Sequence, residues 1–104
     1  MAKAATIRGR GPDSLYRAYL GLDPVPVVST NVQSVAWDDT LRVLFVRFRS
    51  GSLYAYAVPA EVATGMFTAG SKGAFVFDVL RGAGGRRPNR QLDLDRKYEY
   101  VQIE

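Results

Sequence analysis

The stretch LRVLFVRFRSGSLYAYAV, residues 41–58, decides the fold class of this chain. Its first half alternates as one strand of an antiparallel pair does, with two sets of side chains pointing to opposite faces. One face carries Leu44, Val46 and Phe48, and the other carries Phe45, Arg47 and Arg49. A tight turn at Ser50-Gly51 follows, and the chain then returns as a second strand. The pattern predicts a β-hairpin.

The length of the loop at Gly51 decides which side chains share a face, and two registers are open. In a two-residue loop, Tyr54 and Tyr56 join the arginine face and form a platform that could stack unpaired bases. The arginines of that platform would be Arg47 and Arg49. A three-residue loop with a bulge shifts the register by one, which moves both tyrosines to the apolar face. The sequence favours the bulge, since it needs positive φ only at the glycine.

The segments around the hairpin complete an α+β domain. NVQSVAW, residues 31–37, predicts a strand that ends in a turn at Asp38-Asp39-Thr40, which gives a three-stranded antiparallel meander. Residues 60–69, which begin after Pro59, and residues 72–81, which begin after Ser71, have helical spacing of apolar residues. We expect these two short helices to pack on one face of the sheet.

Outside this domain, assigned to residues 27–82, the chain predicts two extended arms. Residues 1–26 form a basic N-terminal arm in which SLYRAYLG can make a short helix, capped by Asp13 or Ser14, before a proline-containing connector. Residues 83–104 are a basic Gly/Arg loop and an extended tail. The last part of that tail is either a further strand or an extension that pairs with a partner's sheet edge.

Composition argues against an enzyme. The 104 residues suffice for one modest core, and they include no cysteine and no histidine. Nucleophile arrangements that need either residue, and zinc sites that use them, are therefore ruled out. The adjacent carboxylates of Asp38-Asp39 are better explained as turn caps, and Ser71-Lys72 as a helix start. We expect no catalytic residue, metal, cofactor or small-molecule substrate.

The positive charge is concentrated near the two ends. The net charge is +4, and residues 1–17 and 81–97 together more than account for it. Such clustering suggests a polyanionic partner, and contact with phosphates needs only charge and reach. We therefore assign nucleic-acid binding to six arginines, with Tyr54 and Tyr56 as stacking candidates. These arginines are Arg47, Arg49, Arg81, Arg86, Arg87 and Arg90.

No apolar run approaches the length of a membrane-spanning helix, and no secretory signal is recognisable. We expect no membrane contact and a location in the cytoplasm or in a phage particle.

Five short motifs occur in order between Val32 and Leu80. They are Trp37-Asp38, LFVRFRSG at 44–51, Tyr54-Ala55-Tyr56, Val58-Pro59 and AGSKG at 69–73. In these five motifs the chain resembles the KTSC domain, a short module of bacterial and phage proteins that also occurs at the C-terminus of some lysyl-tRNA synthetases. Trp37 stands where the family usually has tyrosine, and Phe77-Asp78 stand where it has polar or basic residues. The resemblance implies no activity, and its synthetase association suggests RNA binding.

Two function classes therefore remain. One is a small non-catalytic module that binds RNA or another nucleic acid through its basic segments. The other is a structural or interaction protein, such as an accessory protein of a phage particle, whose terminal arms contact neighbouring subunits or mediate self-assembly.

Overall fold

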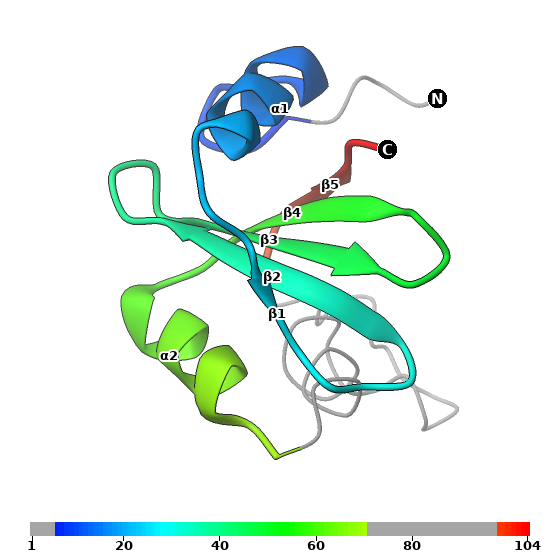
Figure 1. The fold of residues 1–104 in the computed structure, drawn as a ribbon. Helices are drawn as coiled ribbons and strands as arrows, with labels where there is room; N and C mark the ends of the chain where they lie inside the picture. The colour runs from blue at the N-terminus through cyan, green and yellow to red at the C-terminus, as the bar shows by residue number, and fades with distance from the viewer. Residues whose placement is uncertain (1–5, 71–97) are drawn as a thin grey trace, which may run out of the picture.

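Strand β3, Val43–Phe48, lies at the centre of a five-stranded antiparallel sheet in the computed structural model, which describes residues 6–70 and 98–104. The sheet order is β1-β2-β3-β4-β5, the order of the strands along the chain. The other strands are β1 (Val25–Pro26), β2 (Val32–Asp38), β4 (Leu53–Ala57) and β5 (Tyr100–Gln102). Two helices, α1 (Pro12–Leu20) and α2 (Ala60–Thr68), lie on opposite faces of this sheet (Figure 1).

Both faces of the sheet are apolar, and each has its own core. The α2-side cluster has Val32, Val35, Leu44, Val46, Tyr56, Val58, Ala63 and Met66 as its buried members. The α1-side cluster has Ile7, Leu15, Tyr19, Ala36, Val43, Phe45, Leu53, Ala55 and Val101. Residues 43–46 of β3 are buried on both sides, so the sheet would expose one of these sets to water unless a helix covered each face.

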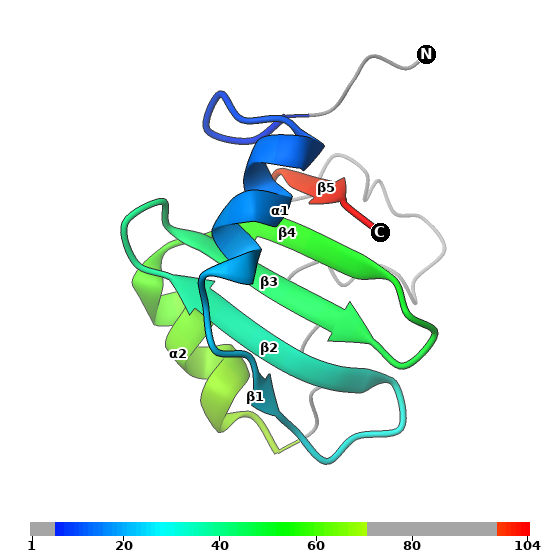
Figure 2. The same cartoon turned by 45° about the horizontal axis from the view of Figure 1, so that its top comes forward.

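Helix α1 is the short helix expected in the N-terminal arm, and it packs on the face of the sheet opposite α2 instead of extending away from the domain (Figure 1). It begins at Pro12, with Gly11 rather than Asp13 or Ser14 at the N-cap, because proline suits the first helical position. Leu15 and Tyr19 lie on its inner side and are buried against the sheet. The described part of the N-terminal arm is therefore folded onto the domain, with α1 crossing the sheet (Figure 2).

Helix α2 lies close to its expected position and covers the other face. The extended backbone of Pro59 makes it the N-cap, and its carbonyl accepts the amide protons of Val62 at 3.0 Å and Ala63 at 3.3 Å. Met66 is the deeply buried residue on the inner side of α2. The second helix expected at 72–81 lies outside the described residues.

Two short edge strands raise the number of strands from the expected three to five. The connector at 23–27 contributes β1, whose Val25 and Pro26 lie opposite Val35 and Ser34. A proline is tolerated there because its missing N–H falls on a sheet edge. At the other edge, β5 pairs with β4 of the same chain, so the further-strand alternative is the correct one for residues 100–102.

Candidate functional site

The β3–β4 hairpin has the bulged, three-residue loop that the sequence favours. Gly51 has φ +102°, its amide donates to the Phe48 carbonyl at 2.8 Å, and the Phe48 amide donates to the Ser52 carbonyl at 2.8 Å. Val46 consequently lies opposite Tyr54, and Leu44 lies opposite Tyr56. Both tyrosines therefore belong to the α2 side of the sheet, opposite Arg47.

Arg47 is held by contacts within the fold. One guanidinium nitrogen, Nη1, donates to the Gly51 carbonyl at 2.8 Å and to Oε1 of Glu104 at 2.5 Å. The guanidinium also lies 5.6 Å from the ring centre of Tyr19, and 21% of the side chain is exposed. Burial lowers the pKa of Arg47, but the interactions with Glu104 and Tyr19 outweigh this and leave it raised. The side chain joins β3, α1 and the C-terminal residue.

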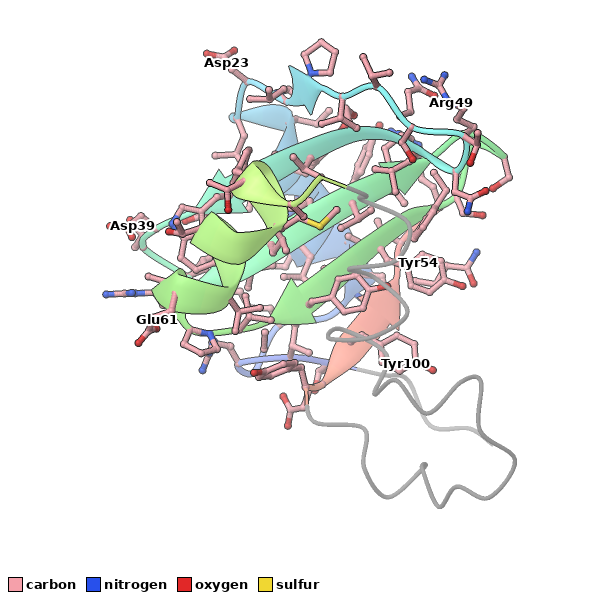
Figure 3. The ribbon with its side chains drawn as sticks, turned by 90° about the horizontal axis from the view of Figure 1, so that it is seen from below. Asp23, Asp39, Arg49, Tyr54, Glu61 and Tyr100 are labelled. Carbon is pink, nitrogen blue, oxygen red and sulfur yellow. The ribbon has the colours of Figure 1, made fainter. Side chains whose placement is uncertain are left out.

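Arg49 joins the hairpin to the loop that follows β1. Its Nε donates to the Ser29 carbonyl at 2.7 Å, and its backbone amide donates to the Asn31 carbonyl at 2.8 Å. Since the residue itself is exposed, a guanidinium nitrogen other than Nε can still reach a ligand. Figure 3 places Arg49 at the opposite end of the sheet from Asp39.

The tyrosines form an aromatic cluster on β4 and β5. Tyr56 is 1% exposed, so its ring is a core element, whereas Tyr54 is half-buried. The ring centres of Tyr54 and Tyr56 are 6.2 Å apart, and each lies 6.0 Å from the ring centre of Tyr100. Tyr54 and Tyr100 project beside one another from neighbouring strands (Figure 3). Sequence alternation did not indicate Tyr100 as a member of this cluster, since its partner strand is 44 positions away.

The adjacent carboxylates of Asp38 and Asp39 lie at the turn after β2 and accept hydrogen bonds there. Oδ1 of Asp38 accepts the amide protons of Thr40 and Leu41, both at 3.0 Å. Oδ1 of Asp39 accepts the indole N–H of Trp37 at 3.2 Å. Asp38 thus has the capping role expected from the sequence, whereas Asp39 accepts from a side chain of strand β2. Ser71-Lys72 lies outside the described residues, and among those described no three acidic side chains gather to hold a metal ion.

The hairpin and its turns lie in a part of the chain that matches a known protein family. The family model of the KTSC domain matches residues 28–83, more than half of the chain. The chain belongs to the KTSC family. A solved structure, that of a KTSC domain protein from Yersinia pestis, is 26% identical, with a TM-score of 0.63, and the match covers 80% of this chain and 99% of that one. No curated protein sequence matches the chain.

The KTSC motifs of this chain lie at positions that shape its backbone. Asp38 caps the turn after β2, and Gly51 makes the bulge between β3 and β4. Val58 is fully buried, and Pro59 starts α2. Ala69 ends α2, while the rest of that motif lies outside the described residues. Among the described residues, the family motifs therefore form turns, helix ends and core positions of the fold.

The basic segment assigned to nucleic acid lies, in sequence, between α2 and β5. Arg81, Arg86, Arg87 and Arg90 lie outside the described residues. The described chain stops at Gly70, just after α2, and resumes at Tyr98, just before β5. Both flanking elements are anchored, because Met66 of α2 is buried and β5 is paired with β4.

Within the described ranges, no helix is long and apolar enough to cross a membrane.

Proposed function

We propose that this KTSC chain is a small non-catalytic module that binds nucleic acid through residues 81–97, with the sheet as its scaffold. The observation that supports this is a segregation of charge. The described residues carry six arginines and seven acidic residues, a net charge of −1. Residues 71–97 carry seven basic and three acidic residues, a net charge of +4. The positive charge of the molecule is thus concentrated between α2 and β5.

Arginine-rich segments suit phosphate contacts for two physical reasons. A guanidinium presents parallel N–H groups that match two phosphate oxygens, and it stays charged at any physiological pH. Contacts to the backbone of a nucleic acid also need no rigid frame. The two elements that flank the segment in sequence, α2 and β5, are both anchored in the domain.

The non-catalytic part of the proposal has its own support. The chain lacks histidine and cysteine, and each carboxylate of the Asp38-Asp39 pair already accepts a hydrogen bond from a neighbouring residue. We place the module in the cytoplasm or in a phage particle.

Salt-dependent binding tests the proposal. Labelled single-stranded RNA and DNA are titrated with the full chain, and fluorescence anisotropy is followed across a salt series. We expect the affinity to fall steeply with salt, and simultaneous replacement of Arg86, Arg87 and Arg90 by alanine to reduce the slope of log K against log salt by about 2, at roughly 0.7 per lost contact. The same three positions changed to lysine keep the charge and should retain the slope. Absence of binding at low salt contradicts the proposal.

A second candidate, a structural or interaction protein such as a phage accessory protein, is favoured by an exposed apolar group around β1. Val28 is 99% exposed, and Leu20 and Val25 are also exposed. Truncation of residues 1–26 is a poor test of this candidate, because it removes core residues of α1. A better test is sedimentation of the Val28→Asp variant, which should lose any self-association of the unchanged chain.

A further inference from the structure

The residues TIRGRGP, 6–12, form a structured turn that presents arginines. Ile7 and Arg10 exchange both backbone hydrogen bonds, at 3.0 and 2.9 Å, and close a two-residue turn. Both central residues have positive φ, 51° at Arg8 and 76° at Gly9, which is the geometry of a type I′ turn. Asparagine or glycine is the usual first residue of such a turn. Here an arginine occupies that position.

The turn is fixed to the domain by Ile7. That side chain is 1% exposed and belongs to the α1-side cluster together with Leu15 and Val101. The turn leads directly into α1, and Arg10 Nη1 donates to Ser14 Oγ of that helix at 3.3 Å. Buried Ile7 and the double hydrogen bond therefore hold the turn in one conformation, with Arg8 at its tip.

The arginines of the turn differ from those of the hairpin in what they contact. Arg47 and Arg49 bond to other parts of the fold. Among the described residues, Arg8 has no side-chain hydrogen bond or ion pair, and Arg10 has only the contact with Ser14. Gly9 and Gly11 are also open, since a Cβ at either would meet no atom within 4 Å. A ligand can approach both the backbone and the side chains of the turn.

The turn lies near the edge of the sheet that β5 forms (Figure 2). Ile7 shares its cluster with Val101 of β5, and the turn lies toward the β5 side of the sheet (Figure 2). Residue 97, the last of the basic segment, is three positions before β5. In sequence, the basic residues 81–97 thus end just before the strand whose Val101 shares a cluster with Ile7 of the turn.

We infer that the Arg8-Gly9-Arg10 turn is a preorganised phosphate-contact element that binds the backbone of a nucleic acid. This inference rests on the proposed function and deepens it. An arginine held in a fixed turn loses less conformational entropy on binding than an arginine on an unconstrained backbone.

Two exposed arginines with the same backbone conformation give a matched test. Arg42, at the turn between β2 and β3, has φ 59° and is exposed like Arg8, but it lies beside Asp38 and Asp39. Asparagine tolerates positive φ, so R8N and R42N remove one charge each and preserve both turns. Binding of labelled single-stranded RNA to the full-length variants is measured across a salt series.

We expect R8N to weaken binding at low salt by roughly five- to tenfold and to reduce the salt slope by about 0.7, the effect of one phosphate contact. R42N should change affinity less than about twofold. R8N should melt no lower than the unchanged chain, because asparagine suits the turn at least as well as arginine. R10Q provides a second variant with the same expected direction.

The outcomes separate this inference from the proposed function. If the unchanged chain binds RNA but R8N and R42N weaken it equally, or R8N not at all, the inference is wrong and the proposed function stands. If the unchanged chain binds no nucleic acid, both fail. Polyglutamate of equal charge should compete poorly, and equal competition would assign the turn to acidic proteins instead.

Discussion

At the scale of single residues, Gly51 determines the character of the hairpin surface. Its positive φ produces the bulge, and the bulge places Tyr54 and Tyr56 on the α2 side while Arg47 lies on the α1 side. A glycine is required for its backbone conformation alone, since a Cβ at this position would meet no atom within 4 Å. One residue thereby prevents the hairpin from presenting tyrosines and arginines on one face.

Gly51→Ala should lower the free energy of unfolding by about 1 to 2 kcal/mol, because an L-residue is strained at this φ. Gly70→Ala is the matched control, since a Cβ there also meets open space and Gly70 does not have positive φ. It should change stability by less than about 0.5 kcal/mol. Urea denaturation measures both variants, and equal effects would show that φ is not what selects glycine at 51.

At the scale of elements, α1 turns the N-terminal segment into part of the core. The helix buries Leu15 and Tyr19, and the Tyr19 ring centre lies 5.3 Å from that of Phe45 in β3. Without α1, the Phe45 side of the sheet would face water, a cost that grows with the apolar area exposed. The helix lies outside residues 28–83, so the described part of the family-matched region does not supply this cover.

Leu15→Ala should therefore destabilise the whole domain, by about 2 to 5 kcal/mol, as truncation of a fully buried leucine does. Arg17→Ala on the exposed side of the same helix is the control, with an expected change within about 0.5 kcal/mol. Thermal unfolding followed by circular dichroism provides the measurement. An unchanged melting temperature for Leu15→Ala would mean that α1 is an independent arm.

At the scale of the whole molecule, local pattern predicted the parts that depend on neighbouring residues. The alternation of β3 and β4, the glycine bulge and the start of α2 near Pro59 all follow from residues within a few positions of one another. The position of α1 does not, because it depends on contacts such as that between Tyr19 and Phe45, which are 26 positions apart in the chain. A signal was nevertheless present, since the unbroken apolar run at 43–46 indicates a strand buried on both faces.

The contacts of the candidate site were harder to predict for the same reason. The alternation of β3 suggested that the Arg47 side chain was free to bind a ligand. Its hydrogen-bond partner, Glu104, is 57 positions away and could not be predicted from neighbouring residues. Arg49 likewise bonds to Ser29, 20 positions upstream. Strand β1 was not predicted because its segment contains prolines, and Pro26 is compatible with a strand only at a sheet edge.

The two ends of the described chain meet in one core, which predicts energetic coupling between them. Ile7 and Val101 are both buried in the α1-side cluster, although 94 positions separate them. Ile7→Ala and Val101→Ala should therefore be non-additive, with an interaction energy of at least about 0.5 kcal/mol in a double-mutant cycle. Val58→Ala lies in the α2-side cluster, and its combination with Ile7→Ala should be additive within about 0.5 kcal/mol. Urea denaturation, with trimethylamine N-oxide added equally to all samples to keep the double variants folded, gives both cycles. Additivity in the Ile7 and Val101 pair would show that the two terminal segments pack independently of one another.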